Sequence, residues 1–118
     1  MKSESKYHNI KTIVDDITFD SKKEARRYLD LKLLQRAGEV VSYFRQPEFV
    51  IINKHRNPWT GKMERENKYR GDFAVKYKGM NHWVIEDVKG GDATKTKDFL
   101  LKRKLFIIRY PCLELRLL

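Results

Sequence analysis

Apolar side chains recur at two spacings along the chain, and each spacing predicts a type of secondary structure. In residues 22–37 and again in residues 99–108 they recur every three or four positions, which is typical of the buried face of a helix. Gly38 is suited to end the first helix, and Pro111 to end the second. Each predicted helix has candidate N-cap residues before it: Asp20 or Ser21 for the first, and Thr94 or Thr96 for the second. The sequence therefore predicts two capped helices.

Runs of β-branched and aromatic residues predict the strands. They predict a small hairpin at 11–19, one bent strand or two short ones at 40–52, and single strands at 69–77, 82–88 and 112–118. The stretch 53–68 is polar and basic with turn signals, and it predicts a hairpin tip or a mobile loop. The order α-β-β-β-α-β is that of a mixed α/β layer. We expect a single domain over residues 1–118, with 1–10 as a flexible lead-in.

The charge balance favours an anionic partner. The 118 residues include 26 Lys+Arg and 16 Asp+Glu, which gives a formal net charge of +10. A basic surface gains affinity for nucleic acid by releasing counterions from the phosphates, and an aromatic fraction of 12% offers rings for base or sugar contact. We therefore expect nucleic acid as the partner, and the alternative is a positive surface that is merely solvated.

Cysteine use and hydropathy indicate the compartment. The single cysteine, Cys112, excludes an internal disulfide and a cysteine-based zinc site, and is typical of a reducing cytoplasm. Residues 1–9 lack the apolar stretch of a secretory signal, and no run approaches the ~18 apolar residues of a membrane span. We expect a cytoplasmic protein with no membrane association.

Two acids and a lysine lie in or next to the predicted strands at 69–77 and 82–88. Side chains alternate faces along a strand, so Asp87 and Lys89 project to one side, where Asp72 of a neighbouring strand can join them. Clustered carboxylates repel each other unless a cation lies between them, and Mg²⁺ takes hard oxygen ligands. This arrangement predicts a metal-dependent nuclease site; the alternative is that both aspartates form surface salt bridges. Glu86 is expected on the opposite face, in a structural role.

Four sequence blocks in this order resemble the PD-(D/E)XK nuclease superfamily, and more narrowly a family of small phage and prophage proteins placed in it. The blocks, which lie within residues 11–110, are Phe19–Tyr28, Gly71–Phe73, Ile85–Gly90 and Leu101–Leu105. The resemblance implies a restriction-endonuclease-like core, in which a mixed β-sheet is flanked by helices. It also implies an endonuclease that uses Mg²⁺ or Mn²⁺ to hydrolyse DNA phosphodiesters, structure-specific cleavage included, in phage or mobile-element DNA metabolism. The implied partners are DNA and phage replication or recombination proteins, in the cytoplasm of a bacterial host.

Carried over to this sequence, the superfamily motif implies roles for four residues. Asp72 matches the first acid and Asp87 the second, and both would bind the metal, with the Val88 backbone carbonyl as a further ligand. Lys89 matches the motif lysine and would orient the attacking water. Gly71 stands where the namesake proline of the motif is often found, which is a common departure.

Glu24 has two interpretations. Ser21-x-x-Glu24 is a capping box, in which the glutamate accepts a hydrogen bond from the Ser21 backbone amide. Glu24 also shares a helical stripe with Tyr28 and Leu31, so its carboxylate can face the sheet. The resemblance favours a catalytic role for Glu24, either as a metal ligand or as a helper of one.

Basic residues in two regions are candidate DNA contacts. Residues 102–104 lie at ~100° steps around the second helix, so they cannot all face one phosphate, and we expect Lys102 to face the active site. The predicted DNA-binding residues are Lys102, Lys104, Arg56, Lys62 and Arg65, with Trp59 near the last three. The alternatives are a solvated helix face and an ordinary hairpin tip.

Two other functions compete with a nuclease. One is a catalytically silent DNA-binding or partner-regulating protein on the same fold, and the other is an RNA-binding module. If the chain is a nuclease, one motif set in 118 residues supplies one active site. Duplex cleavage then needs two sites or two successive cuts, so we expect a homodimer, at least transiently, on DNA.

Overall fold

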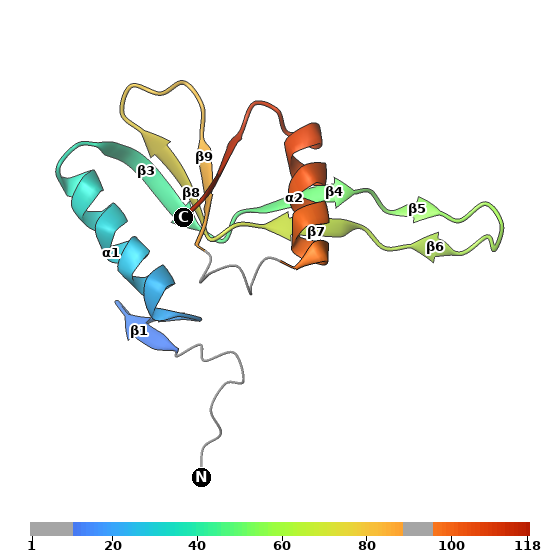
Figure 1. Ribbon diagram of the computed structural model, residues 1–118, viewed down its shortest axis with the longest axis horizontal. Helices are drawn as coiled ribbons and strands as arrows, with labels where there is room; N and C mark the ends of the chain where they lie inside the picture. Colours follow the sequence, from blue (N-terminus) through green and yellow to red (C-terminus); the bar gives the residue numbers. More distant parts are fainter. Residues whose placement is uncertain (1–10, 89–95) are drawn as a thin grey trace, which may run out of the picture.

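The structure is a computed structural model that describes residues 11–88 and 96–118. The elements, in chain order, are β1 (Thr12–Val14), β2 (Ile17–Phe19), α1 (Lys22–Arg36), β3 (Val40–Arg45), β4 (Glu48–Ile52), β5 (His55–Arg56), β6 (Met63–Glu64), β7 (Asn67–Arg70), β8 (Phe73–Tyr77), β9 (Val84–Asp87), α2 (Lys97–Arg109) and β10 (Glu114–Leu117). The expected lead-in at 1–10 lies outside the described residues. The fold of the described part is mixed α/β, as the sequence predicts (Figure 1).

Both predicted helices are present, and side-chain caps fix where they begin. Ser21 Oγ accepts the Glu24 backbone N–H at 3.1 Å at the start of α1. Thr96 Oγ1 accepts the Phe99 N–H at 3.1 Å at the start of α2. These caps satisfy amides that have no partner within the helix. No helix in the described part of the chain is long and apolar enough to cross a membrane.

The central sheet has four strands in the order β10-β9-β8-β3. Strand β8 runs antiparallel to β3 and β9, whereas β9 and β10 are parallel. A parallel pair needs a long crossover connection, and α2 lies on the connection between β9 and β10. The sheet is therefore mixed, as expected.

The prediction of one continuous strand over 69–77 is wrong. The chain bends at Gly71 and Asp72, so that β7 pairs with β4 while β8 pairs with β3 and β9. The paired segment bends at the same level, where Gln46 adopts a positive φ of 55°. The Gly71 N–H donates to the Pro47 carbonyl at 3.0 Å, which holds the two bends together. The β4–β7 ribbon thereby leaves the central sheet.

Two apolar clusters occupy the two faces of the sheet. The first consists of Phe19, Ala25, Leu31, Val40, Phe73 and Val75, and brings in α1. The second consists of Ile51, Tyr69, Ala74, Ile85 and Phe106, and brings in α2 and the β4–β7 ribbon. Alternation along β8 explains the division, since Phe73 and Val75 face α1 while Ala74 faces α2. The helices lie on either side of the sheet (Figure 1).

The polar stretch after β4 forms an extended hairpin. Strands β5 and β6 pair antiparallel, and the hairpin projects away from both helices (Figure 1). We call residues 53–66 the arm. The sequence predicts either a hairpin tip or a mobile loop here, and the hairpin is confirmed.

Candidate active site

The sheet register brings Asp72 and Asp87 together. Phe73 pairs with Glu86 at the end of the antiparallel β8–β9 ladder, and Asp72 and Asp87 are the next residues along the two strands. The Asp72 N–H donates to the Glu86 carbonyl at 2.9 Å, which is one residue out of the ladder register. The side chains of Asp72 and Asp87 lie within hydrogen-bond reach of each other, and this contact helps to raise the pKa of Asp72. The two carboxylates therefore meet where β8 begins and β9 ends.

Burial and repulsion raise the pKa of Asp72. Asp87 is 2% exposed, and Asp72 is partly buried. Burial, together with the charges of Asp87 and Glu24, raises the pKa of Asp72 to about 7, against the opposing effect of a hydrogen bond from the Val88 backbone N–H. That bond to Asp72 Oδ2 is 2.6 Å long. Asp72 therefore exchanges a proton near neutral pH, in contact with a second carboxylate.

Tyr69 completes the buried side of the pair. Its hydroxyl donates to Asp87 Oδ2. Burial, followed by the neighbouring Asp87 carboxylate, raises the pKa of Tyr69 well above its ordinary value, so the hydroxyl stays a donor. The sequence analysis missed Tyr69 because it placed this residue at the start of one long strand. The sequence feature that could have identified Tyr69 is that it is an aromatic residue between two basic ones, Lys68 and Arg70.

Glu24 approaches the same cluster from α1. It is 6% exposed, and its charge contributes to the raised pKa of Asp72. Burial and the nearby Asp20 raise the pKa of Glu24 itself, and the charges of Arg45 and Arg70 oppose that rise. The backbone amide that donates to its carboxylate is that of Asp20 rather than Ser21, so the expected capping box is only half formed.

Arg45 is a second residue that the sequence analysis missed. Its guanidinium lies over the Phe19 ring, with Cζ 4.7 Å from the ring centroid. Its Nε is buried and has no hydrogen-bond partner within the described residues. Its charge acts on Glu24, which places a cation beside the acids. The missed signal is a charged residue at the end of a strand that is otherwise apolar except for Ser42.

The remaining predicted site residues are dispersed. Lys89 lies outside the described residues, and Val88 is half-buried. On α2, Lys102 pairs with Asp98 at 3.7 Å, while the charge that reaches Tyr69 is that of Arg103. Lys104 is exposed on the same helix, and the arm carries three further predicted DNA contacts, all exposed: Arg56, Lys62 and Arg65.

Comparison with known proteins places the chain in a family. A family model described as "Protein of unknown function (DUF1064)" matches residues 4–118. The chain belongs to the DUF1064 family. No curated protein and no solved structure matches it. The function of this DUF1064 chain must therefore be inferred from its own residues.

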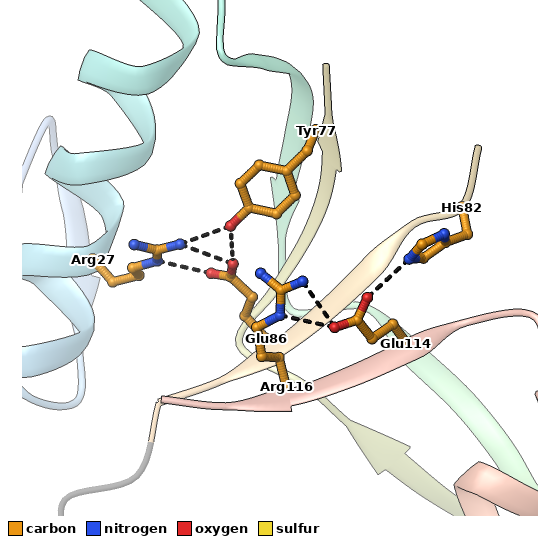
Figure 2. Close-up of polar contacts among 6 residues, drawn as sticks. All are labelled: Arg27, Tyr77, His82, Glu86, Glu114 and Arg116. Carbon is orange, nitrogen blue, oxygen red and sulfur yellow. Dashed lines mark hydrogen bonds and ion pairs between the residues drawn. The ribbon is translucent and has the colours of Figure 1, made fainter. Parts of the chain in front are cut away.

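The opposite face of β9 holds a separate polar cluster (Figure 2). Glu86 is 0% exposed. Its carboxylate accepts hydrogen bonds from Nε and Nη2 of Arg27 on α1, each at 2.8 Å, and another from the Tyr77 hydroxyl. Burial and the Glu86 carboxylate raise the pKa of Tyr77 to about 12. Nearby, Glu114 bonds His82 and Arg116, each at 2.8 Å. The expectation that Glu86 faces away from the aspartates is confirmed, and its contacts tie α1 to the sheet.

The oxygen donors of this DUF1064 site can be compared with the ligands that a metal ion requires. Within the described residues no group of three or more His, Cys, Asp or Glu side chains is arranged to hold a metal. Two carboxylates and a backbone carbonyl are nevertheless hard oxygen donors, and Mg²⁺ is often bound by one or two carboxylates with water and substrate phosphate as the other ligands. The residues present therefore fit Mg²⁺ or Mn²⁺ as a site completed by substrate.

Proposed function

We propose that this protein is a metal-dependent endonuclease that hydrolyses DNA phosphodiesters, on a restriction-endonuclease-like core of the PD-(D/E)XK type. One observation carries the proposal: the carboxyl groups of Asp72 and Asp87 are in contact at the end of the sheet, and the pKa of Asp72 is raised to about 7. A buried pair of this kind is stabilised when a cation replaces the proton. The order of the motifs along the chain supports the same assignment.

The proposed roles follow from the contacts around the pair. Asp72 and Asp87 would hold the metal with the Val88 carbonyl, while the Tyr69 hydroxyl and the Val88 N–H fix the orientation of the two carboxylates. A bound Mg²⁺ or Mn²⁺ would lower the pKa of water and offset charge on the phosphate. Lys89 would orient the water, and Glu24 would help to balance charge in the site.

Charge supports DNA as the substrate. The chain has a formal net charge of +10, and exposed cations lie on α2 and on the arm. Neutralising phosphates releases counterions and provides affinity that does not depend on sequence. Phage replication or recombination proteins are the proposed partners, and cleavage of both strands would bring two copies of the chain together on DNA.

A catalytically silent DNA-binding protein is the second candidate. Tyr69 and the Val88 amide already satisfy one oxygen each of Asp87 and Asp72, and the described residues supply no third acidic ligand at metal-binding distance. Such a site can remain protonated and purely structural. This reading predicts DNA binding without a metal-dependent product.

Cleavage of labelled DNA decides between the two candidates. Linear, nicked, flap and four-way-junction substrates are incubated with Mg²⁺, Mn²⁺ or EDTA, using the natural protein, Asp87→Asn, Lys89→Ala and the control Glu39→Gln. Glu39 is an exposed acid outside the site. Metal-dependent cutting that is lost in the first two variants and kept in the control supports the nuclease. Tight binding with no product under any metal refutes it in favour of the silent protein.

A further inference from the structure

The tip of the arm is an ordered turn that leaves its largest side chain uncovered. Trp59 is 94% exposed. Asn57 Oδ1 accepts the backbone N–H of Trp59 at 2.9 Å and that of Thr60 at 3.3 Å, and Asn57 O accepts the Gly61 N–H at 2.8 Å. Gly61 has a φ of +74°, which glycine adopts without strain. The turn is thus held by its own hydrogen bonds, with no contribution from packing of the indole.

The charges around this tip are positive and in part uncompensated. Among the described residues, no carboxylate forms an ion pair with Lys54, Arg56, Lys62 or Arg65. Arg56 Nη1 donates to the Gly61 carbonyl at 2.6 Å, which keeps its guanidinium against the turn. The acid closest to the tip, Glu64, is engaged by Asn57 Nδ2 at 3.0 Å. An exposed aromatic ring therefore has, on both sides of the hairpin, cations that no carboxylate of the described residues neutralises.

We propose that Trp59 is a base-stacking residue, and that the arm recognises an unpaired nucleotide in the DNA substrate. The inference rests on the proposed function for the identity of the substrate. An indole stacks on any nucleobase, while neighbouring cations follow the phosphates. In a continuous duplex each base is already stacked on its neighbours, so the ring gains a partner where a gap, flap or junction leaves a base free. The substrate class is then DNA that contains unpaired nucleotides.

The chemistry of the arm fits nucleic acid better than a protein partner. An apolar protein contact would need a patch of neighbouring apolar groups, whereas Pro58 and Met63 are the only other apolar side chains of the arm beside methyl-bearing Thr60, and the rest are polar or charged. A single large ring between cations matches the alternation of base and phosphate along a nucleic-acid strand. The hydrogen-bonded turn also lowers the entropy lost on binding, because its backbone is already in place.

Binding without cleavage tests the proposal separately from the nuclease. Fluorescence anisotropy is measured in EDTA on an Asp87→Asn background, with a labelled duplex and with the same duplex carrying a short single-stranded gap. Trp59→Ala should weaken binding to the gapped DNA by about 5- to 150-fold, the equivalent of one lost base–aromatic stack. Trp59→Phe should keep most of the affinity. Ile108→Ala, at a site that is 76% exposed on α2, is the matched control and should change nothing.

A second readout reports stacking directly. In a Trp83→Phe background Trp59 is the only tryptophan, because the chain has two. Gapped DNA should quench its fluorescence more strongly than continuous duplex. Equal weakening of both DNAs by Trp59→Ala, or an unchanged affinity for gapped DNA, overturns the stacking proposal. Gap-selective binding in a protein that cuts no DNA with any metal keeps the stacking proposal and overturns the nuclease.

Discussion

Replacing Asp72 by asparagine should stabilise the fold increasingly as the pH rises. Asparagine keeps a side-chain oxygen for the Val88 N–H and removes the charge that faces Asp87. In the folded natural protein, burial raises the pKa of Asp72 from 3.8 to about 7. Its contribution to stability is fully present below pH 3.8, and it is lost as the pH rises to about 7.

The size of the effect follows from that interval. Stability changes by ~1.4 kcal/mol for each pH unit in which the folded state holds a proton that the unfolded state has lost. Between pH 5 and the folded-state pKa of about 7, the advantage of Asp72→Asn over the natural protein should therefore grow by roughly 2 kcal/mol, because Asp72 is half ionised at its pKa. The difference should level off about one pH unit above that pKa, where Asp72 is ionised in both states.

Urea unfolding followed by far-ultraviolet circular dichroism measures this difference at a series of pH values. Comparing the two proteins at each pH cancels the titration of acids that they share, and Glu39→Gln serves as the control for loss of an exposed carboxylate. Mg²⁺ provides an independent check. At about ten times its dissociation constant, Mg²⁺ should stabilise the natural protein by about 1.4 kcal/mol and leave Asp72→Asn unchanged.

Two results would refute this reasoning. A stability difference that stays constant between pH 5 and 8 would mean that Asp72 is ionised throughout, so that neither burial nor the neighbouring acids perturb it. If the free energy of unfolding of the natural protein instead rises with pH relative to that of Asp72→Asn, a nearby cation must favour the ionised carboxylate. Stabilisation by Mg²⁺ that persists in Asp72→Asn would place the metal elsewhere on the chain.

Three further substitutions test the packing that supports the site. Gly71→Ala should destabilise the fold by about 1–3 kcal/mol in urea unfolding, because the added Cβ would lie 2.7 Å from Ile85 Cγ2. A cost that is undiminished in an Ile85→Ala background would contradict this cause. Arg27→Met should cost about 3–5 kcal/mol in the same assay, since it leaves the Glu86 carboxylate buried without its cation; a cost below 1 kcal/mol would contradict this reasoning. Ser21→Ala should cost about 1 kcal/mol in thermal unfolding and Ser21→Gly only a few tenths, and equal losses would argue against the N-cap.

The pattern of residues along single strands predicts some residues of the candidate site and misses others. Alternation along a strand correctly separates Glu86 from the side of Asp87, since this depends only on neighbouring residues. It cannot supply Tyr69 or Arg45, which reach the acids from β7 and β3. Lys89, the motif residue that completes the predicted set, lies outside the described residues and stays a prediction.

The bend at Gly71 is a feature of the fold that the sequence pattern also fails to predict. Residues 69–77 have continuous strand character, and a sequence pattern therefore extends the strand through them. The break depends on the Pro47 carbonyl and on close approach to Ile85, neither of which is near Gly71 in the chain. A proline at position 71 would remove the N–H that bonds Pro47, and any side chain would place its Cβ 2.7 Å from Ile85 Cγ2, which gives a physical reason for glycine here.

By itself, the sequence determined both helices, the small N-terminal hairpin and the positions of the acids on their strands, and it limited each helix cap to two candidate residues. These features depend on hydrogen bonds and side-chain spacing within a few residues of each other. Only the tertiary structure decided that β9 and β10 are parallel, that the carboxyl groups of Asp72 and Asp87 are in contact, and that the arm presents an uncovered Trp59. Those properties depend on strand register and on packing between segments far apart in the chain, where the energy of a contact is set by neighbours that local pattern does not identify.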